Sequence, residues 1–235
     1  MGRIFEKRKY TMFARYDRMA KGFTRVGKEI AIAVKLGGPN PDNNPRLRVT
    51  IQNAKGINMP KDRIEAAIKR ASSKDEKNLE EVVYEGYGPH GIGIVVECAT
   101  DNPTRTVANV RLLFNRGNGT FGKTGSLDFM FERKGVFTLA AQNMNRDELE
   151  LELIDFGAEA IEEEEEHIYI YTKFTDFGAI QKALEQKGLH IIKSELQRIP
   201  HTTTALTPEQ ETEVMELVEK LEADDDVQNV YHNLR

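Results

Sequence analysis

Residues 117–124 read Gly-Asn-Gly-Thr-Phe-Gly-Lys-Thr, which matches the pattern of a phosphate-binding loop at every required position. Such a loop surrounds a nucleotide's phosphates with backbone N–H groups and one lysine, and it works only between a strand and the N-terminus of a helix. Here the pattern predicts a helix before the loop and a strand after it. We therefore expect a flexible glycine-rich turn in which Lys123 can contact a polyanion, and a nucleotide-binding protein is a minor alternative.

Lysine and arginine are concentrated at the beginning of the chain. Residues 1–78 hold 19 of them against 8 Asp and Glu, a formal charge of +11, whereas residues 79–235 hold 14 against 30, a formal charge of −16. This asymmetry indicates a polyanion-binding part joined to an acidic body. The alternative is that the surface charges merely drifted during evolution and the asymmetry has no function. The basic residues that we expect to contact nucleic acid are Arg3, Lys7, Arg8, Lys9, Arg15, Arg18, Lys21, Arg25, Lys28, Lys35, Arg46, Arg48, Lys55, Lys61, Arg63, Lys69, Arg70 and Lys123.

Four aromatic residues lie among the cations of the first 20 residues, namely Phe5, Tyr10, Phe13 and Tyr16. This composition suits an arm that stacks on bases and follows phosphates. The same aromatics could equally pack on the helices that follow, and the pattern does not choose between the two arrangements.

The other reactive residue types do not form a site. The five histidines are scattered, and none lies two to four residues from another histidine or from Cys98, so no metal-ligand spacing is present. Cys98 lies in an apolar segment, where a cysteine serves as a small buried hydrophobe. The five carboxylates of residues 162–166 would alternate faces in an extended chain and cannot form one calcium cage. We therefore expect no catalytic residue, no metal and no cofactor, and a protein that is not an enzyme.

The composition excludes several further classes of protein. One cysteine excludes a disulfide framework, and the chain lacks the run of about 20 apolar residues that a transmembrane helix needs. The first 25 residues lack the apolar stretch of a signal peptide. We expect a soluble, cytoplasmic chain whose partner is nucleic acid, either DNA or ribosomal RNA on the ribosome, with no membrane partner and no small-molecule substrate. The oligomeric state is not predicted.

Three short amphipathic helices are predicted within residues 21–72. The first ends at Gly37-Gly38-Pro39, and the second begins with Asn44 as N-cap and Pro45 at the first helical position. The third begins at Pro60. Helices of this length with brief connections predict a small bundle, and the cations between the apolar positions must face outward.

The acidic part predicts two α/β units. A linker is expected over residues 73–81 and a sharp turn over 84–91. The first unit is expected to contain strands at 92–98 and 127–131 with a helix from Asn102, completed by a helix after Thr207 and a strand over 227–231. The pattern of residues 135–199 is strand, helix, strand, strand, helix, strand, which is the ferredoxin-like split motif.

These elements predict an α+β fold in which an N-terminal three-helix bundle is followed by two ferredoxin-like α/β domains, one inserted into the other. The predicted domains are a basic helical domain with an N-terminal arm (1–78), a discontinuous α/β domain (82–134 plus 205–235) and an inserted ferredoxin-like domain (135–200).

Several stretches together resemble one family in their order and spacing. They are Lys35-Leu36-Gly37-Gly38, Asn44-Pro45-Arg46-Leu47-Arg48, Asn58-Met59-Pro60-Lys61-Asp62, Tyr84-Glu85-Gly86-Tyr87-Gly88-Pro89, Thr100-Asp101-Asn102, Phe129-Met130-Phe131-Glu132-Arg133-Lys134-Gly135 and the ending from Asp224 to Asn233. From residue 21 onward the chain is similar to the YebC/PmpR family, whose mitochondrial members are translational activators of cytochrome c oxidase synthesis.

The resemblance implies three domains, one helical and two α/β, in a cytoplasmic, non-enzymatic regulator of gene expression. The family is labelled as a DNA-binding transcriptional regulator, and some members act instead on the ribosome and ease synthesis through proline-rich stretches. The family's basic positions correspond to Arg46, Arg48, Lys61 and Arg63, and its loop before the Phe129 strand to residues 117–126. Most members begin Gly-His-Ser-Lys-Trp, whereas this chain has Gly2-Arg3-Ile4-Phe5-Glu6, so a base contact by that tail is not carried over.

Overall fold

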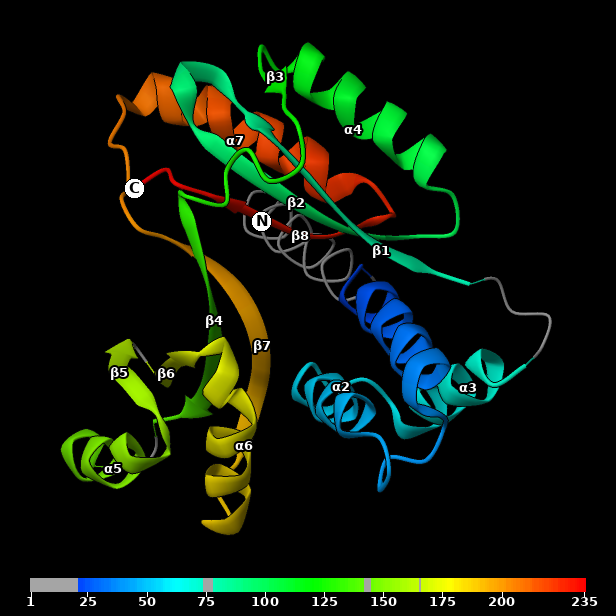
Figure 1. Ribbon diagram of the computed structural model, residues 1–235, viewed down its shortest axis with the longest axis vertical. Helices are drawn as coiled ribbons and strands as arrows, with labels where there is room; N and C mark the ends of the chain where they lie inside the picture. The colour runs from blue at the N-terminus through cyan, green and yellow to red at the C-terminus, as the bar shows by residue number, and fades with distance from the viewer. Residues whose placement is uncertain (1–20, 74–77, 142–144, 165) are drawn as a thin grey trace, which may run out of the picture. The chain divides into compact units, whose positions relative to one another are not determined.

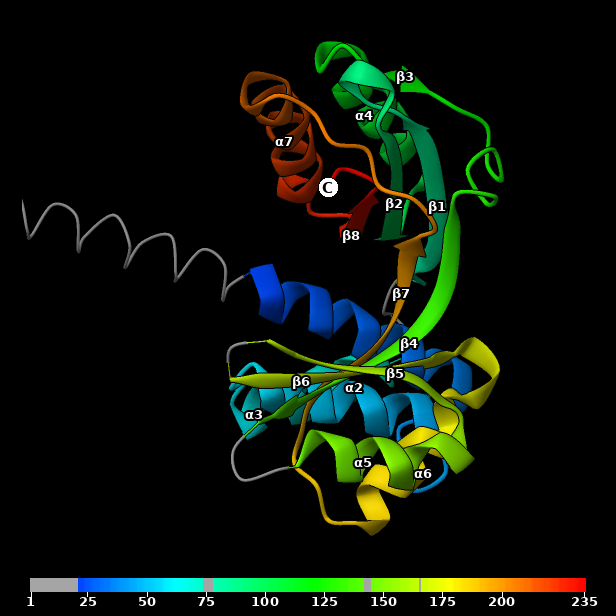
Figure 2. The same ribbon diagram turned by 90° about the vertical axis from the view of Figure 1, so that its left-hand side faces the viewer.

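The computed structural model describes residues 21–73, 78–141, 145–164 and 166–235. The chain folds as two compact units divided between Asn78 and Leu79 (Figures 1 and 2). The predicted arm lies outside the described residues, and with it Arg3, Lys7, Arg8, Lys9, Arg15, Arg18 and the four interleaved aromatics.

The first unit contains the three predicted helices. The described part of the first helix spans residues 21–37, and it is followed by α2 (Pro45–Gly56) and α3 (Lys61–Ala71). Their apolar stripes meet in one small core, to which each helix contributes fully or nearly fully buried residues such as Ile30, Leu47 and Ile64. The prediction of an N-terminal helical bundle is therefore confirmed.

The side chain of Asn44 connects the end of the first helix to the start of α2. Its Oδ1 accepts from the backbone N–H of Leu47 at 3.0 Å, as expected of an N-cap. Its Nδ2 donates to the carbonyls of Ala33 at 2.7 Å and Gly38 at 2.8 Å. A Cβ on Gly37 would lie 2.7 Å from Asn44, so only glycine leaves room for this amide.

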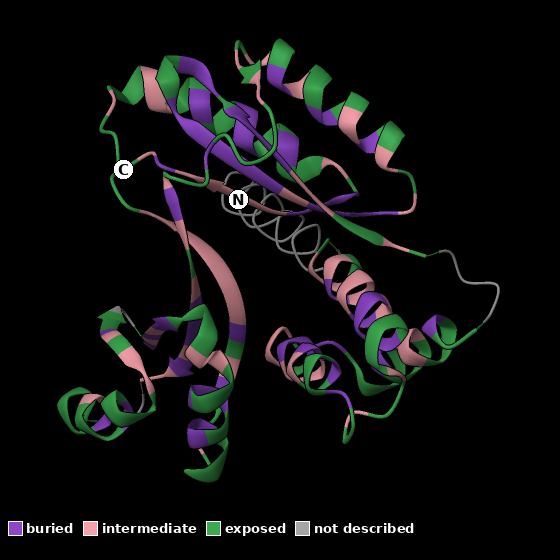
Figure 3. Ribbon diagram, in the orientation of Figure 1, coloured by how far each residue is buried: buried purple, intermediate pink, exposed green. Residues whose placement is uncertain are grey.

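The second unit begins with a four-stranded antiparallel sheet in the order β3-β1-β2-β8. Its strands are β1 (Glu80–Tyr87), β2 (Gly93–Thr100), β3 (Thr120–Phe121) and β8 (Val227–His232). Helices α4 (Pro103–Arg116) and α7 (Pro208–Ala223) cover one face (Figure 1). Their inner stripes, which include Phe114 and Leu217, belong to one buried cluster with residues of β2. Figure 3 marks the buried parts of these helices and of the sheet in purple.

Strand β1 contradicts the linker expected up to residue 81 and the first half of the turn expected over residues 84–91. The second half does turn, because Pro89–Gly91 forms a single 3-10 turn before β2. The strand pairs with β2 without interruption from Glu80 opposite Thr100 to Tyr87 opposite Gly93. The glycines of this segment are typical of a turn, although the segment forms a strand. A Cβ on Gly86 would lie 2.6 Å from the Thr120 carbonyl oxygen and 2.8 Å from the Phe114 ring, so this glycine permits close packing within a strand.

The second sheet has the order β5-β6-β4-β7 and is also antiparallel. Its elements are β4 (Phe131–Ala140), α5 (Arg146–Leu153), β5 (Ala158–Glu164), β6 (His167–Lys173), α6 (Phe177–Gln186) and β7 (Ile191–Pro200). This is the predicted ferredoxin-like order. The first sheet has the same arrangement of strands in space, although the chain passes through them in a different order. Strands β2, β3, β1 and β8 occupy the positions that β4, β5, β6 and β7 occupy in the second sheet.

The predicted strand over residues 127–131 is wrong at its beginning. Residues 127–130 form a turn in which the N–H of Met130 donates to the Leu127 carbonyl at 2.9 Å, and β4 begins at Phe131. Leu127 is fully buried whereas Phe129 is 72% exposed, so the two do not share an inner face. The alternation of apolar and polar residues here comes from a turn whose two ends, Leu127 and Phe131, are buried.

In chain order, the second sheet lies between the two pieces of the first, because β8 pairs with β2. The two sheets are joined by polar contacts between their strands. Arg198 donates from Nε to Glu97 at 2.9 Å, and the Tyr231 hydroxyl donates to the Leu196 carbonyl at 3.3 Å. Burial raises the pKa of the Tyr231 phenol, so the hydroxyl keeps its proton for this bond. The division of residues 79–235 into the discontinuous and inserted domains stays a prediction.

Replacing Asn44 by Ala should lower the free energy of unfolding by about 2–3 kcal/mol. The change removes the helix cap and leaves the Ala33 and Gly38 carbonyls without their amide donor. Chemical unfolding of the full chain followed by circular dichroism measures the effect. Asn43→Ala, at an exposed neighbouring position, is the control and should change stability by less than about 0.5 kcal/mol. Equal stability of the two variants would contradict the assignment.

Candidate nucleic-acid interface

The predicted cations of the helical unit lie on its surface. Arg25 and Lys28 are half-buried. The exposed members are Lys21, Lys35, Arg46, Arg48, Lys55, Lys61, Arg63, Lys69 and Arg70. They are distributed over all three helices, so the candidate interface is not confined to one helix.

On α2 the basic residues lie on two faces. Arg48 and Lys55 are seven residues apart and therefore share one side of the helix, whereas Arg46 points to another side. The guanidinium of Arg48 also has a structural role, because its Nη1 donates to the carbonyls of Pro41 at 3.2 Å and Asp42 at 3.4 Å in the preceding turn. A contact by Arg48 with phosphate would compete with these bonds.

On α3 one cation lies beside a carboxylate and another lies on an aromatic ring. The Nζ of Lys61 is 3.6 Å from the Glu65 carboxylate, but the two side chains are 90% and 65% exposed, so the pair is weak and a phosphate can replace it. The guanidinium of Arg63 lies over the Phe23 ring at 5.7 Å from its centroid and so joins α3 to the first helix.

Three exposed cations occupy the last turns of their helices, namely Lys55 on α2 and Lys69 and Arg70 on α3. A positive charge there stabilises the C-terminal end of a helix through the helix dipole, typically by about 0.3–1 kcal/mol. This structural role leaves the ends of the long side chains in solvent. These three residues are therefore the most suitable members of the surface for a binding test.

Lys123 is exposed and belongs to the second unit, so it is not part of the helical surface. Its glycine-rich stretch begins at Gly117, where α4 ends, runs through β3 and continues into turns before β4. The strand before the loop and the helix after it that a nucleotide-phosphate loop requires are both missing from these described residues. The arrangement therefore does not support nucleotide binding.

The carboxylate of Glu85 accepts hydrogen bonds from the residues that directly follow the 117–124 stretch. Glu85 lies on β1, is 2% exposed, and accepts from the N–H of Gly125 at 2.9 Å and of Leu127 at 2.7 Å. The Ser126 hydroxyl donates to the same group at 3.3 Å. The glycine-rich sequence predicts a flexible turn here and gives Glu85 no role. No local signal marks this residue, because its partners lie about 40 positions along the chain.

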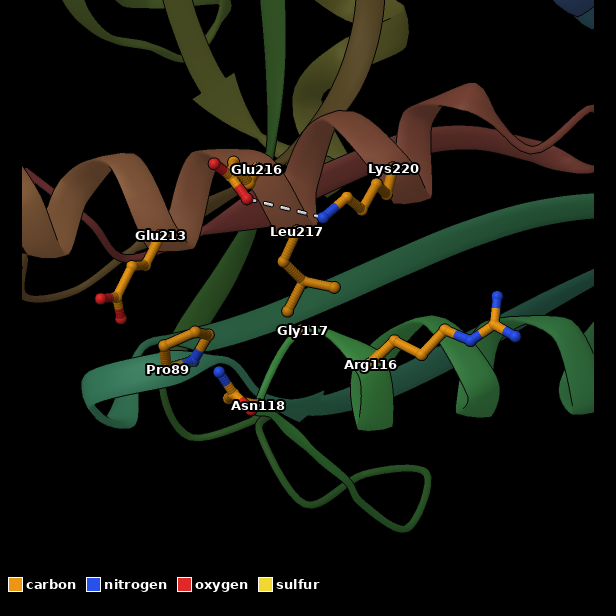
Figure 4. A pocket seen from close by; sticks show the side chains of 8 residues that line it. All are labelled: Pro89, Arg116, Gly117, Asn118, Glu213, Glu216, Leu217 and Lys220. Atoms are coloured by element: carbon orange, nitrogen blue, oxygen red, sulfur yellow. Dashed lines mark ion pairs between the residues drawn. The ribbon is translucent and has the colours of Figure 1, made fainter.

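A small hollow lies between the end of α4 and α7 (Figure 4). Its lining residues are Pro89, Arg116, Gly117, Asn118, Glu213, Glu216, Leu217 and Lys220. Both of its acidic groups already have a lysine or histidine neighbour: Lys220 is 3.5 Å from Glu216, and His90 Nε2 is 2.8 Å from Glu213. Leu217 projects toward Gly117, where a Cβ would lie 2.8 Å from it, so the hollow is a packing seam between two helices.

Within the described part of the chain, the His, Cys, Asp and Glu residues form no group of three or more that could hold a metal ion. Cys98 is buried in β2, as expected of a small hydrophobe. A search of the same residues found no helix with both the length and the apolar character that a membrane crossing needs.

Two family models match the chain. The model described as the TACO1/YebC protein N-terminal domain matches residues 3–74, and the model described as the TACO1/YebC second and third domain matches residues 79–234. Both matches together cover the helical unit and the two sheets.

Curated relatives are similar over the full chain and carry the name "Probable transcriptional regulatory protein". The one from Cytophaga hutchinsonii is 60% identical over 100% of this chain and 98% of its own length. The one from Flavobacterium johnsoniae is 55% identical over 100% of this chain and 99% of its own length. A solved structure of a conserved hypothetical protein from Aquifex aeolicus is 38% identical, with a TM-score of 0.82 over 92% of this chain and 90% of that one.

Replacing Glu85 by Gln should loosen residues 125–127. A neutral amide accepts more weakly than a carboxylate and brings an NH₂ group toward N–H donors, so at least one bond is lost. Hydrogen exchange of the Gly125 and Leu127 amides should accelerate about 10- to 100-fold. Glu80→Gln, at an exposed position of the same strand, is the control. Unchanged protection of both amides would show that Glu85 does not hold the loop.

ATP and GTP should not bind at millimolar concentration, because a helix precedes the 117–124 stretch and turns follow it, whereas a phosphate-binding loop needs a strand before it and a helix N-terminus after it. Isothermal titration calorimetry of the full chain with each nucleotide and Mg²⁺ measures this directly. Saturable binding that Lys123→Ala abolishes would contradict the interpretation and restore the phosphate-binding loop.

Proposed function

Because this chain belongs to the TACO1/YebC family, we propose that it is a nucleic-acid-binding regulator of gene expression whose helical unit contacts the sugar-phosphate backbone. Its relatives are named as regulatory proteins, which supports a regulatory role rather than an enzymatic one. The proposed interface consists of the exposed cations of residues 21–73.

The observation that carries the proposal is the exposure of these cations. Residues 21–73 hold 11 Lys and Arg against 4 Asp and Glu, a formal charge of +7. Nine of the 11 residues are exposed on the surface of the helical unit. A surface of this charge attracts a polyanion and releases its condensed counterions on binding.

The distribution of the cations favours contact with phosphates over base-specific recognition in a groove. Recognition helices place several side chains of one face against base edges in the major groove. Here the cations lie on different faces of α2 and α3 and in their last turns. Phosphate contacts position a protein without reading sequence, so the helical unit provides affinity and orientation.

The acidic remainder of the chain supports the same interpretation. Residues 79–235 carry a formal charge of −16, so the net charge of this unit opposes approach to phosphates, whereas the net charge of the helical unit favours it. This charge separation orients an approaching molecule so that the helical unit meets the phosphates first. The name of the relatives makes duplex DNA the first polymer to test, and ribosomal RNA serves as the comparison.

Replacing Lys55, Lys69 and Arg70 together by Gln should weaken binding to duplex DNA and flatten its salt dependence. Each lost phosphate contact reduces the slope of log K against log salt by about 0.9 on duplex DNA and about 0.7 on a single strand. Three lost contacts should therefore make the slope about 2–3 less negative. Fluorescence anisotropy of a labelled duplex between about 0.05 and 0.2 M salt measures the slope.

The matched control changes the same number of charges in the acidic unit, with Lys182, Lys187 and Lys193 replaced by Gln. Circular dichroism of both triple variants verifies that they remain folded. Equal affinity and equal slope for the wild type and the first triple variant would remove these cations from the interface. Retention of binding to ribosomes but not to duplex DNA would assign the same surface to ribosomal RNA.

A further inference from the structure

Phe129 is the most exposed aromatic side chain among the described residues, with 72% of its surface accessible. It lies in the turn between the glycine-rich stretch and β4. A fold that holds such a ring in solvent forgoes the stabilisation that its burial would provide. A single exposed hydrophobe is ordinary, and Phe129 is informative only because its surroundings fix it in this position.

The backbone on both sides of Phe129 is anchored. Leu127 and Phe131 are buried with Val95 in a small cluster on the face of the first sheet away from α4 and α7. The carbonyl of Met130 accepts from the N–H of His201 at 2.9 Å. A Cβ on Gly93 would lie 3.0 Å from the Met130 side chain, which therefore packs directly on β2.

The Glu85 carboxylate fixes the approach to the turn from the other side. It accepts from the N–H groups of Gly125 and Leu127, four and two residues before Phe129. Burying a charged carboxylate costs desolvation free energy, which hydrogen bonds from three donors offset. Once these bonds are made, they hold the carboxylate and its donors firmly together. The ring therefore projects from a turn whose position is determined by contacts of the backbone and side chains before and after it.

The residues that share this turn indicate what the ring meets. Lys123 and Thr124 are exposed in the same stretch and supply a cation and a hydroxyl. An exposed ring and an exposed cation six residues apart on one segment suit single-stranded nucleic acid, in which bases stack on aromatic side chains and cations follow the phosphates. A protein-docking site presents several apolar residues together. The exposed residues next to Phe129 in the sequence are Gly125, Ser126 and Asp128, none of which carries a large apolar side chain.

We propose that Phe129 stacks on an unpaired base of the bound nucleic acid while Lys123 contacts a neighbouring phosphate. This inference rests on the proposed function and adds a second contact to it, in the other unit of the chain. It also gives the glycine-rich stretch a role that needs no bound nucleotide.

The test uses the absence of tryptophan from this chain. Phe129→Trp introduces one tryptophan at the proposed stacking position, and a base stacked on an indole quenches its fluorescence. Titration with a labelled single strand of about 12 nucleotides gives binding by anisotropy and stacking by tryptophan emission in the same sample. We expect the emission to fall by about half or more at saturation. Phe174→Trp, at a residue that is 50% exposed and follows β6, should show little change and is the control.

A second pair of variants measures the contribution of stacking. Phe129→Leu keeps an apolar side chain without a ring, and it should weaken single-strand affinity about tenfold. Phe129→Tyr keeps the ring and should bind as the wild type does. Affinity for a blunt duplex without unpaired bases should be the same in all three proteins.

The outcomes separate the two proposals. Unquenched emission from the Phe129→Trp variant, together with unchanged affinity in Phe129→Leu, overturns the stacking contact and leaves the helical interface intact. Wild-type protein that binds neither single strand nor duplex and is not retained on ribosomes overturns the proposed function itself. Loss of affinity in Phe129→Leu, together with quenched emission from Phe129→Trp, supports the stacking contact.

Discussion

The small core of the helical unit is the constraint on which the rest of the account depends. Three short helices bury their Ile, Val and Leu side chains against one another, and only one stripe of each helix fits that core. Charged side chains cannot enter it without losing their hydration, so the lysines and arginines must lie outside. A positive surface over residues 21–73 is therefore a direct consequence of how this segment folds. The proposed binding to a polyanion uses this surface.

The glycine-rich stretch shows why a motif needs its structural context. Its letters match a phosphate-binding loop, and the amides next to it do bind an anion, but that anion is the chain's own Glu85 carboxylate. Backbone donors of the kind that surround phosphate in other folds are used here to fix a turn. The consequence is a rigid support for Phe129 and an exposed position for Lys123. One internal interaction thus accounts for both the fixed course of this stretch and the exposure of an aromatic ring.

Much of the fold could be predicted because its signals are local. Asn44 followed by Pro45 predicted the start of α2, and the order of elements in residues 135–199 predicted the ferredoxin-like sheet. Strand β1 was missed because Gly86 is needed for packing against Phe114 and β3, which no local pattern reveals. The segment before β4 was misassigned because a turn that begins at Leu127 imitates the alternation of a strand. In the candidate interface, exposure of the cations followed from helical periodicity, whereas the role of Glu85 depends on partners distant in sequence.

The central claim is that the wild-type chain holds nucleic acid mainly through phosphates. The most direct measurement is its affinity for one duplex over a range of salt concentrations, expressed as the slope of log K against log salt. With each phosphate contact contributing about 0.9, an interface of several cations predicts a steep negative slope of about −3 or beyond. An affinity that stays constant as salt rises, or no measurable affinity at low salt, would contradict the claim.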